Sequence, residues 1–354
     1  FFLLVSINRD LKKIKNLEFA LPNLLKYLDL VALGTVCDLV KLDLINRALV
    51  KQGLKVFNQT NNLGLSSLIN ESNIKESINC FHLGYVIGPR INAGGRVGKS
   101  SLGTEILLSS NQKETDIIAK KLGEFNNLRK KIESQVETQA CTMVNENNII
   151  CVNSNNWHPG VIGIVASKLT EKYNKPSIVI SFGNSHGTGS ARSIQSIDLS
   201  KIIHLAKDKK ILIDGGGHKM AAGIKIKKNL LTKFKSFLDN FFKDYSENLF
   251  VKIDKYDSLL SLDKINLDLM DEILKLEPFG AGNNEPQFII KDIKIQKTQI
   301  VKDKHILIFF QNDFSTNLKG ICFNCINSVL GDYLLNYKKY KFLIGCTIKK
   351  DNFS

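Results

Sequence analysis

The chain has 354 residues, of which 43% are hydrophobic and 23% are charged, and its formal net charge at pH 7 is +15. This length predicts two or three domains, and no apolar run reaches the roughly 18 residues of a membrane span. The excess of Lys and Arg favours a polyanionic partner, because these side chains displace condensed counterions from phosphates. The seven cysteines are an odd number without a secretory signal, which argues against a disulfide framework and fits a reducing cytoplasm. The sequence opens at Phe1, inside an apolar stretch and without Met, which indicates a fragment of a longer protein.

The first third of the sequence predicts helices over 23–57, where apolar side chains recur at helical spacing with an interruption at Gly34. Asp38 follows that interruption in an apolar setting, where an unpaired carboxylate is costly. Mn²⁺ or Mg²⁺ would offset the cost, because both ions prefer oxygen ligands, and a helix cap or local salt bridge is the alternative. Residues 83–98 are rich in Gly and Arg and predict a loop, which either binds phosphate or is simply a solvated basic segment.

The middle of the sequence predicts a connecting helix and then an α/β domain. Residues 119–140 are expected to form a long, partly exposed helix between two domains. Short apolar runs typical of strands then alternate with helical patterns, the strands at 149–152, 177–181 and 211–214 and the helices at 161–173 and 229–244. Such alternation is typical of an α/β domain.

Three segments of this domain are predicted to be loops or turns that carry polar groups. The turn 157–160 contains His158, which either binds substrate or shapes the turn, and 187–193 is a loop of Gly, Ser and Arg. Three glycines at 215–217 follow a predicted strand and place the imidazole of His218 beside exposed backbone donors, which suits a phosphate or a leaving group. Residues 219–223 are expected to begin a helix.

The last part of the sequence, from about residue 246, predicts a small β-barrel of the OB type. Its expected strands are separated by turn residues and lie at 249–253, 287–296, 305–311, 318–323 and 341–348. Phe288, Phe309 and Phe310 are candidate platforms for nucleobases, although at least two of them are expected to pack in the core.

Taken in order, these segments are similar to RecJ exonucleases, which are metal-dependent phosphodiesterases of the DHH family. The matching segments are residues 28–38, 46–47, 88–96, 157–167, 189–193, 215–223, 277–280 and 283–286. The resemblance implies an α/β fold in four parts, namely the C-terminal part of a DHH catalytic domain (1–120), a connecting helix (121–145), a DHH-associated domain (146–245) and an OB-like nucleic-acid-binding domain (246–354). It further implies a 5′-to-3′ exonuclease specific for single-stranded DNA, acting in recombination and repair.

The same resemblance assigns roles to individual residues. Asp38 resembles a metal-ligand aspartate, His218 the histidine that meets the scissile phosphate, and Arg192 a phosphate-binding arginine. Arg90, Asn92 and Arg96 resemble the family's DNA-contacting loop. The further candidates for substrate binding, which lie in matching segments, are His158, Ser190, Gly215, Gly216 and Gly217. The implied chemistry is hydrolysis by two Mn²⁺ or Mg²⁺ ions about 4 Å apart, with His218 and Arg192 stabilising charge on the phosphate.

The sequence also departs from the family. It has no His-His pair and none of the family's early aspartates, so the active site of this chain is expected to be incomplete through N-terminal truncation. The alternatives are a non-catalytic fragment that binds single-stranded nucleic acid, or a DHH-family phosphodiesterase acting on short oligonucleotides. Expected partners are single-stranded DNA, a helicase and a single-strand-binding protein, in the cytoplasm and away from membranes. The C-terminal domain of alanyl-tRNA synthetases carries a similar glycine-histidine segment, but Asp38 and residues 88–96 argue against that relation.

Overall fold

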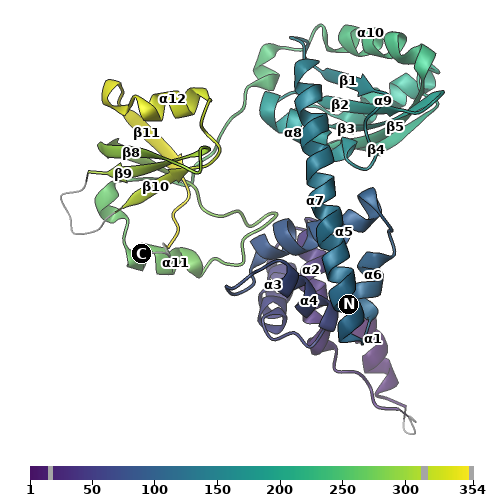
Figure 1. Cartoon of the computed structure of the whole chain (residues 1–354), viewed down its shortest axis with the longest axis vertical. Helices are drawn as coiled ribbons and strands as arrows, with labels where there is room; N and C mark the ends of the chain where they lie inside the picture. The colour runs from purple at the N-terminus through teal and green to yellow at the C-terminus, as the bar shows by residue number, and fades with distance from the viewer. Residues whose placement is uncertain (15–18, 312–317, 351–354) are drawn as a thin grey trace. The chain divides into compact units, whose positions relative to one another are not determined.

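The computed structural model of the chain describes residues 1–14, 19–311 and 318–350. The chain divides into two compact units, which are described separately: Phe1–Phe57 with Asp254–Ser354, and Asn58–Ile253 (Figure 1). In the described ranges, no helix is both long enough and apolar enough to cross a membrane.

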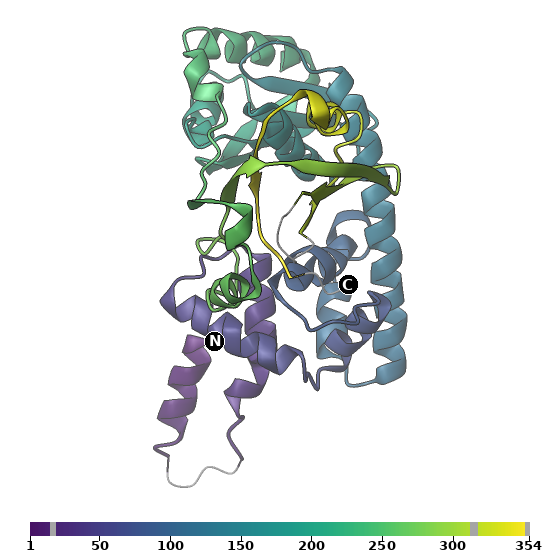
Figure 2. The same cartoon turned by 90° about the vertical axis from the view of Figure 1, so that its left-hand side faces the viewer.

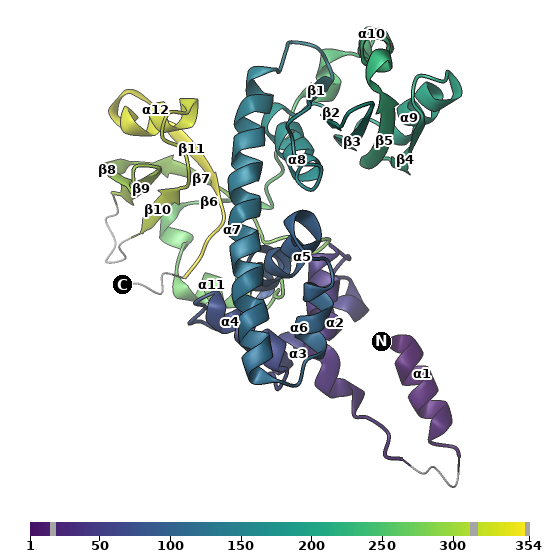
Figure 3. The ribbon, with the colours of Figure 1, turned by 45° about the vertical axis from the view of Figure 1, so that its right-hand side comes forward.

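The unit 58–253 begins with helices. They are α4 (Leu63–Glu71), a π-helical turn (His82–Ile87), α5 (Gly88–Val97), α6 (Leu102–Leu108) and α7 (Gln112–Thr142). The predicted long helix is therefore confirmed as α7 (Figure 3). The side chain of Asn111 caps its first turn by accepting from the backbone N–H of Glu114.

The prediction of a loop over 83–98 was wrong, because this segment is helical up to Val97. Pro89 lies in the first turn of α5, where its missing N–H costs no hydrogen bond. Gly94 is buried, and a β-carbon there would lie 2.7 Å from the carbonyl oxygen of Lys99. This glycine therefore permits close packing of the helix against its neighbour. Composition alone does not distinguish such a packing glycine from one that makes a loop flexible.

A five-stranded sheet follows, in the spatial order β1-β2-β3-β5-β4. Its strands are β1 (Ile150–Ser154), β2 (Ser177–Phe182), β3 (His186–Arg192), β4 (Asp214–His218) and β5 (Ala221–Lys227). Helices α7 and α8 (Ile162–Tyr173) pack on one face, while α9 (Leu199–Asp208) and α10 (Leu231–Phe242) pack on the other (Figure 3). Each face has its own hydrophobic core, so the predicted α/β domain is confirmed.

Four local predictions in this sheet were wrong. The strand predicted at 211–214 is displaced, because β4 begins only at Asp214. Residues 187–193 are not a loop but most of β3, and the glycines 215–217 are not a turn but part of β4. Residues 219–223 do not begin a helix, because 219–220 form a turn and β5 starts at Ala221. The core-facing positions of β3 are glycines and an alanine, so no apolar alternation marks the strand. A β-carbon at Gly189 would lie 2.6 Å from the side chain of Ile224, which shows how tightly this row packs.

The other unit combines N-terminal helices with a C-terminal β-rich domain. The helices are α1 (Phe2–Leu11), α2 (Leu28–Cys37) and α3 (Leu44–Phe57). Helix α1 buries none of its side chains and stands at the edge of the unit (Figure 2). Helices α2 and α3 touch closely at Gly53, where a β-carbon would lie 2.2 Å from the carbonyl oxygen of Leu28.

The C-terminal domain contains two three-stranded sheets, in the orders β10-β9-β8 and β11-β7-β6. Its elements are β6 (Ser258–Leu260), α11 (Leu267–Leu274), β7 (Phe288–Ile293), β8 (Ile295–Val301), β9 (His305–Phe310), β10 (Lys319–Cys322), α12 (Val329–Leu335) and β11 (Phe342–Cys346). Four predicted strand regions are confirmed, whereas the predicted strand 249–253 is wrong, because Glu247–Phe250 forms a 3-10 turn.

The three candidate aromatic platforms of this domain are differently placed. Phe288 belongs to one hydrophobic core, and Phe310 packs against another. Phe309 is half-buried, with the amine of Lys297 5.5 Å from its ring centre. The expectation that at least two of the three rings serve packing is therefore confirmed for Phe288 and Phe310.

Candidate anion-binding site

The rows of residues across the sheet show which side chains share a face in the unit 58–253. Arg192 on β3 lies opposite Ala221 on β5, and Ala221 lies opposite His218 on β4. Directly opposed residues project to the same face of a sheet, so Arg192 and His218 flank Ala221 at about 10 Å, two strand spacings apart. The next row on this face contains Ser190, Gly223 and Gly216.

Glycine keeps the middle of this face open. A β-carbon added to Gly216 or to Gly223 would meet no atom within 4 Å. The face therefore has a bare backbone floor at Gly223 and Gly216, beside Ser190 and next to the row that contains Arg192, Ala221 and His218. We call this surface, made by Ser190, Arg192, Gly216, His218 and Gly223, the open face.

The three predicted glycines do not have equal positions. Gly216 lies on the open face, but Gly215 points to the opposite face, where a β-carbon would lie 2.7 Å from the side chain of Ile203. Gly217 has a φ of +156°, and a β-carbon there would lie 2.2 Å from the carbonyl oxygen of Ala221. Of the three, only Gly216 lies on the open face with free space above its α-carbon.

The guanidinium group of Arg192 is fixed at one wall of the open face. Its Nη1 donates to Ser190 Oγ at 3.1 Å and to the carbonyl oxygen of Ala191 at 2.9 Å. Burial lowers the pKa of Arg192, and the positive charge of Arg96 lowers it further. The two arginines are therefore close enough to repel one another, an arrangement that an anion would stabilise.

Arg96, at the end of α5, is held by the turn that precedes α8. Its Nη1 donates to the carbonyl oxygen of Gly160 at 3.1 Å. Burial lowers the pKa of Arg96, as does the charge of Arg129, while Glu133 acts in the opposite direction. Within the described part of the chain, no ion pair includes Arg96 or Arg192.

The N-terminus of α8 contributes a further positive element. A β-carbon at Gly163, in the first turn of this helix, would lie 3.1 Å from Ser190 Oγ and 3.4 Å from Arg192 Nη2. Helix N-termini carry unpaired N–H groups and partial positive charge, which favour anions. The open face thus offers Arg192 and a hydroxyl group to one anionic group such as a phosphate, and Arg96 and the N-terminus of α8 add positive charge beside it.

The turn 157–160 positions this helix. Trp157 is buried, its indole Nε1 donates to Gln139 Oε1 at 2.8 Å, and its carbonyl accepts from Ser181 Oγ at 2.5 Å. His158 is exposed, and its Nδ1 accepts from the backbone N–H of Gly160 at 3.1 Å. The structure therefore gives His158 the turn-shaping contact that the sequence left as one of two alternatives.

The remaining candidates lie outside the open face. Arg90 donates to the carbonyl oxygen of Val86 at 2.8 Å; burial lowers its pKa, and the charge of Glu71 opposes that shift. Asn92 is exposed on α5. The sequence did not single out Gly163 and Gly223 as site residues, and no local signal distinguishes them, because their importance comes from strand register and helix placement.

Asp38 belongs to the other unit and follows the last turn of α2. It is exposed, and its backbone N–H donates to the carbonyl oxygen of Gly34 at 3.0 Å. Across residues 1–14, 19–311 and 318–350, no three His, Cys, Asp or Glu side chains gather in a way that could hold a metal ion. Asp38 offers one oxygen ligand, so the described residues do not fit the two-metal site that the resemblance implies.

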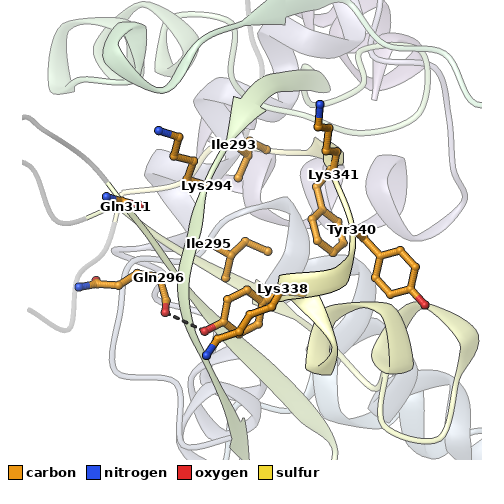
Figure 4. Close-up of a pocket in the computed structure, with 10 residues that line it drawn as sticks. Ile293, Lys294, Ile295, Gln296, Gln311, Lys338, Tyr340 and Lys341 are labelled. Atoms are coloured by element: carbon orange, nitrogen blue, oxygen red, sulfur yellow. Dashed lines mark hydrogen bonds between the residues drawn. The ribbon is translucent and has the colours of Figure 1, made fainter.

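The C-terminal domain has a basic pocket of its own, with a volume of about 610 Å³. Lys294, Lys338 and Lys341 line it, together with Tyr340, and no Asp or Glu is among the described residues that line it (Figure 4). The hydroxyl of Tyr337 donates to the carbonyl oxygen of Gln296 at 2.9 Å, which ties the segment before β11 to β8. The described part of the pocket lining therefore presents positive charge.

Comparison of the sequence with known protein families and proteins finds several matches. A family model described as the DHHA1 domain matches residues 145–244, and one described as the RecJ OB domain matches residues 256–353. The single-stranded-DNA-specific exonuclease RecJ of Bacillus subtilis is 32% identical over 308 residues, which are 84% of this chain and 39% of that protein. The exonuclease of the same name from Haemophilus influenzae is 33% identical over 284 residues, 75% of this chain and 49% of that protein.

The fold agrees with these sequence matches. The crystal structure of RecJ in complex with Mn²⁺ from Thermus thermophilus superposes with a TM-score of 0.77 and 26% identity, covering 86% of this chain and 45% of that one. The chain thus spans half or less of the length of each of these three relatives. With its DHHA1 and RecJ OB domains, the chain belongs to the RecJ family.

Proposed function

We propose that this chain is part of a single-stranded-DNA-specific exonuclease that hydrolyses phosphodiester bonds from the 5′ end. Its parts are the C-terminal part of a DHH domain (1–120), a connecting helix (121–145), the DHH-associated domain (146–245) and the OB domain (246–354). The open face is the observation that carries the proposal, because two arginines without ion-pair partners converge there with Ser190 and the N-terminus of α8.

The residues of the open face and the neighbouring Arg96 have separate roles at one phosphate group. Arg192 and Arg96 bind its oxygens with charge-assisted hydrogen bonds. The bare floor at Gly216 and Gly223 lets the sugar–phosphate backbone approach the sheet closely. His218, across the floor from Arg192, contacts the scissile phosphate and stabilises the charge that develops there during cleavage.

Asp38 is proposed as one oxygen ligand of a Mn²⁺ or Mg²⁺ ion. The described residues do not group further ligands around it, so the chemistry assigned to this chain is confined to binding and charge stabilisation at the phosphate. A function limited to binding single strands is the alternative that this observation favours. Substrate binding by the open face is common to both accounts and is tested first.

Binding of a single strand tests the role of the open face. The probe is a 5′-phosphorylated, fluorescently labelled oligothymidine, and fluorescence anisotropy of the 354-residue chain gives the dissociation constant. Arg192→Gln and Arg96→Gln should each weaken binding by about tenfold or more, the range expected for loss of a charged hydrogen bond. Each should also lower the slope of log K against log salt concentration by about one.

Lys233→Gln is the matched control, since it removes one positive charge from the exposed surface of α10, a helix on the opposite side of the sheet. The dissociation constant of this variant should stay within about twofold of the parent value, because the variant loses only one charge of the general positive field of the protein. Thermal unfolding of each variant shows that it is folded. If both arginine variants bind as tightly as Lys233→Gln, the open face is not the phosphate site and the proposed function loses its support.

A further inference from the structure

Two aromatic rings are stacked on the surface of the unit 58–253 just before α5. The ring centres of Phe81 and Tyr85 are 5.3 Å apart, and their planes meet at 26°. The two side chains are also largely exposed, Phe81 at 60% and Tyr85 at 73%. Exposing two stacked rings to water forgoes hydrophobic stabilisation, which a ligand with a flat apolar face would restore.

The rings are mounted on a rigid base. His82, next to Phe81, is buried; its Nδ1 accepts from the N–H of Asn79 at 3.2 Å, and its Nε2 lies 3.0 Å from Glu76 Oε1. The ring of Phe81 meets that of His82 edge-on, with centres 5.9 Å apart. The π-helical turn His82–Ile87 carries Tyr85. π-helical turns are uncommon in proteins, and those that occur often lie at functional sites. The position of Tyr85 on such a turn therefore agrees with a ligand-binding surface.

The pair shares a surface line with polar residues of α5. The π-helical turn runs directly into α5, and the exposed positions of this continuous helix include 85, 92 and 96, which follow Phe81 at near-helical intervals. Along that line Tyr85 is followed by Asn92 and then by Arg96. Arg96 interacts electrostatically with Arg192 of the open face, so the line leads from the rings to the proposed phosphate site.

We propose that Phe81 and Tyr85 form a base-stacking platform for the part of a single strand that lies beyond the open face. The inference rests on the proposed function and adds to it a second binding site for the same strand. Stacked rings offer flat apolar faces to nucleobases whatever their sequence, while Asn92 and Arg96 can bind the sugar–phosphate backbone between the two sites. The platform thus serves bases, and the open face serves phosphate.

The spacing sets the strand length that the platform requires. Eleven residues separate Tyr85 from Arg96, which at 1.5 Å per residue is about 16 Å along the helix. At the roughly 3.4 Å spacing of a stacked strand this distance holds about five nucleotides. A dinucleotide bound at the open face therefore does not reach the rings, whereas a strand of roughly twelve nucleotides does.

The test compares long and short strands on the 354-residue chain. Phe81→Ala and Tyr85→Ala should each weaken binding of an oligothymidine of roughly twelve nucleotides by about fivefold or more, the lower end for loss of one stacked base. Binding of 5′-phosphorylated dithymidine should not change. Tyr85→Leu should weaken the long strand as much as Tyr85→Ala, since leucine keeps apolar area but offers no ring face. Ile117→Ala is the control, because Ile117 is 69% exposed on α7 of the same unit.

A spectroscopic reporter separates stacking from other contacts. The single tryptophan of the chain, Trp157, is buried, so Tyr85→Trp adds an exposed indole whose fluorescence reports on the platform. The long thymidine strand should quench this added signal, and an abasic strand of equal length and charge should not. Equal quenching by both strands, or full binding by Tyr85→Leu, would overturn the stacking proposal.

The inference can fail while the proposed function survives. If the alanine variants of Phe81 and Tyr85 bind the long strand like the parent, but Arg192→Gln does not, then the open face stands and the platform is refuted. If the parent chain instead dimerises in sedimentation experiments and Tyr85→Ala abolishes the dimer without changing strand binding, the rings are a self-association surface, and the proposal is likewise refuted.

Discussion

Two adjacent glycines of β4 provide a strong contrast between stability and binding. Gly216 lies on the open face, and a β-carbon there would meet nothing within 4 Å. Gly217 has a φ of +156°, and its β-carbon would lie 2.2 Å from the carbonyl oxygen of Ala221. Substitution at one position should therefore affect the ligand, and at the other the fold.

The expected magnitudes follow from these environments. Gly216→Ala should leave the free energy of unfolding unchanged or raise it by about 0.4–1 kcal/mol, because alanine restricts the unfolded chain. Gly217→Ala should lower it by about 1–2 kcal/mol for the unfavourable backbone conformation alone. Relief of a 2.2 Å contact with main-chain atoms requires the β4–β5 pair to shift and adds to this loss. The two variants should thus differ by about 2 kcal/mol or more.

Affinity for single-stranded DNA should instead be sensitive to a larger side chain at Gly216. Gly216→Leu places an isobutyl group on the floor of the open face, two residues before His218 on β4, so we expect at least about a tenfold loss of affinity for single-stranded DNA with little loss of stability. Urea unfolding measures the free energy, and fluorescence anisotropy measures the affinity. Two results would refute the reasoning: Gly217→Ala as stable as Gly216→Ala, or Gly216→Leu binding the strand as tightly as the parent.

Two further predictions concern other parts of the chain. Arg47 Nη2 donates to the carbonyl oxygens of Leu276 at 2.7 Å and Glu277 at 3.1 Å. Arg47→Ala should therefore lower the free energy of unfolding, measured by urea titration, by about 1.5–3 kcal/mol. Lys55 is an exposed position of the same helix, so Lys55→Ala should have little effect in the same titration. Equal losses in both variants would contradict a role for these hydrogen bonds. Burial raises the pKa of Cys151 to about 12 and that of Cys322 to about 12, and a raised pKa lowers the thiolate fraction at any given pH. At pH 8 both thiols should therefore react with iodoacetamide far more slowly in the folded chain than in the chain unfolded by urea. Peptide mapping measures the two rates, and equal rates in the folded and unfolded chains would contradict the burial argument.

The sequence predicts those parts of the fold that carry a periodic apolar pattern. Helix α7 and strand β2 show such a pattern and were predicted at their observed places. Strands β3 and β4 escaped prediction because their core-facing residues are Gly and Ala, which give no hydrophobic signal. The helical segment 83–98 was missed for a related reason, because the buried Gly94 permits contact between backbones.

Local motifs suggest candidate site residues, but the arrangement of a site comes from tertiary structure. Arg192 and His218 are far apart in the chain, and only the pairing of both with Ala221 shows that they share one face. Spacing along the sequence also did not reveal that Gly223 joins Gly216 in the floor, or that the N-terminus of α8 reaches Ser190. The roles of His218, Arg192 and Asp38 in catalysis and metal binding remain predictions of the family resemblance.

The most direct test of the central claim is hydrolysis of a 3′-labelled, 5′-phosphorylated single strand by the protein expressed from the whole reading frame that contains this chain, with Mn²⁺. The parent protein should shorten the single strand from its 5′ end and leave the matching blunt duplex intact. His218→Ala should reduce the rate by about 100-fold or more, the range for removing one group that stabilises transition-state charge, while the strand still binds. Hydrolysis by His218→Ala at the parent rate, or equal cleavage of strand and duplex, would contradict the account.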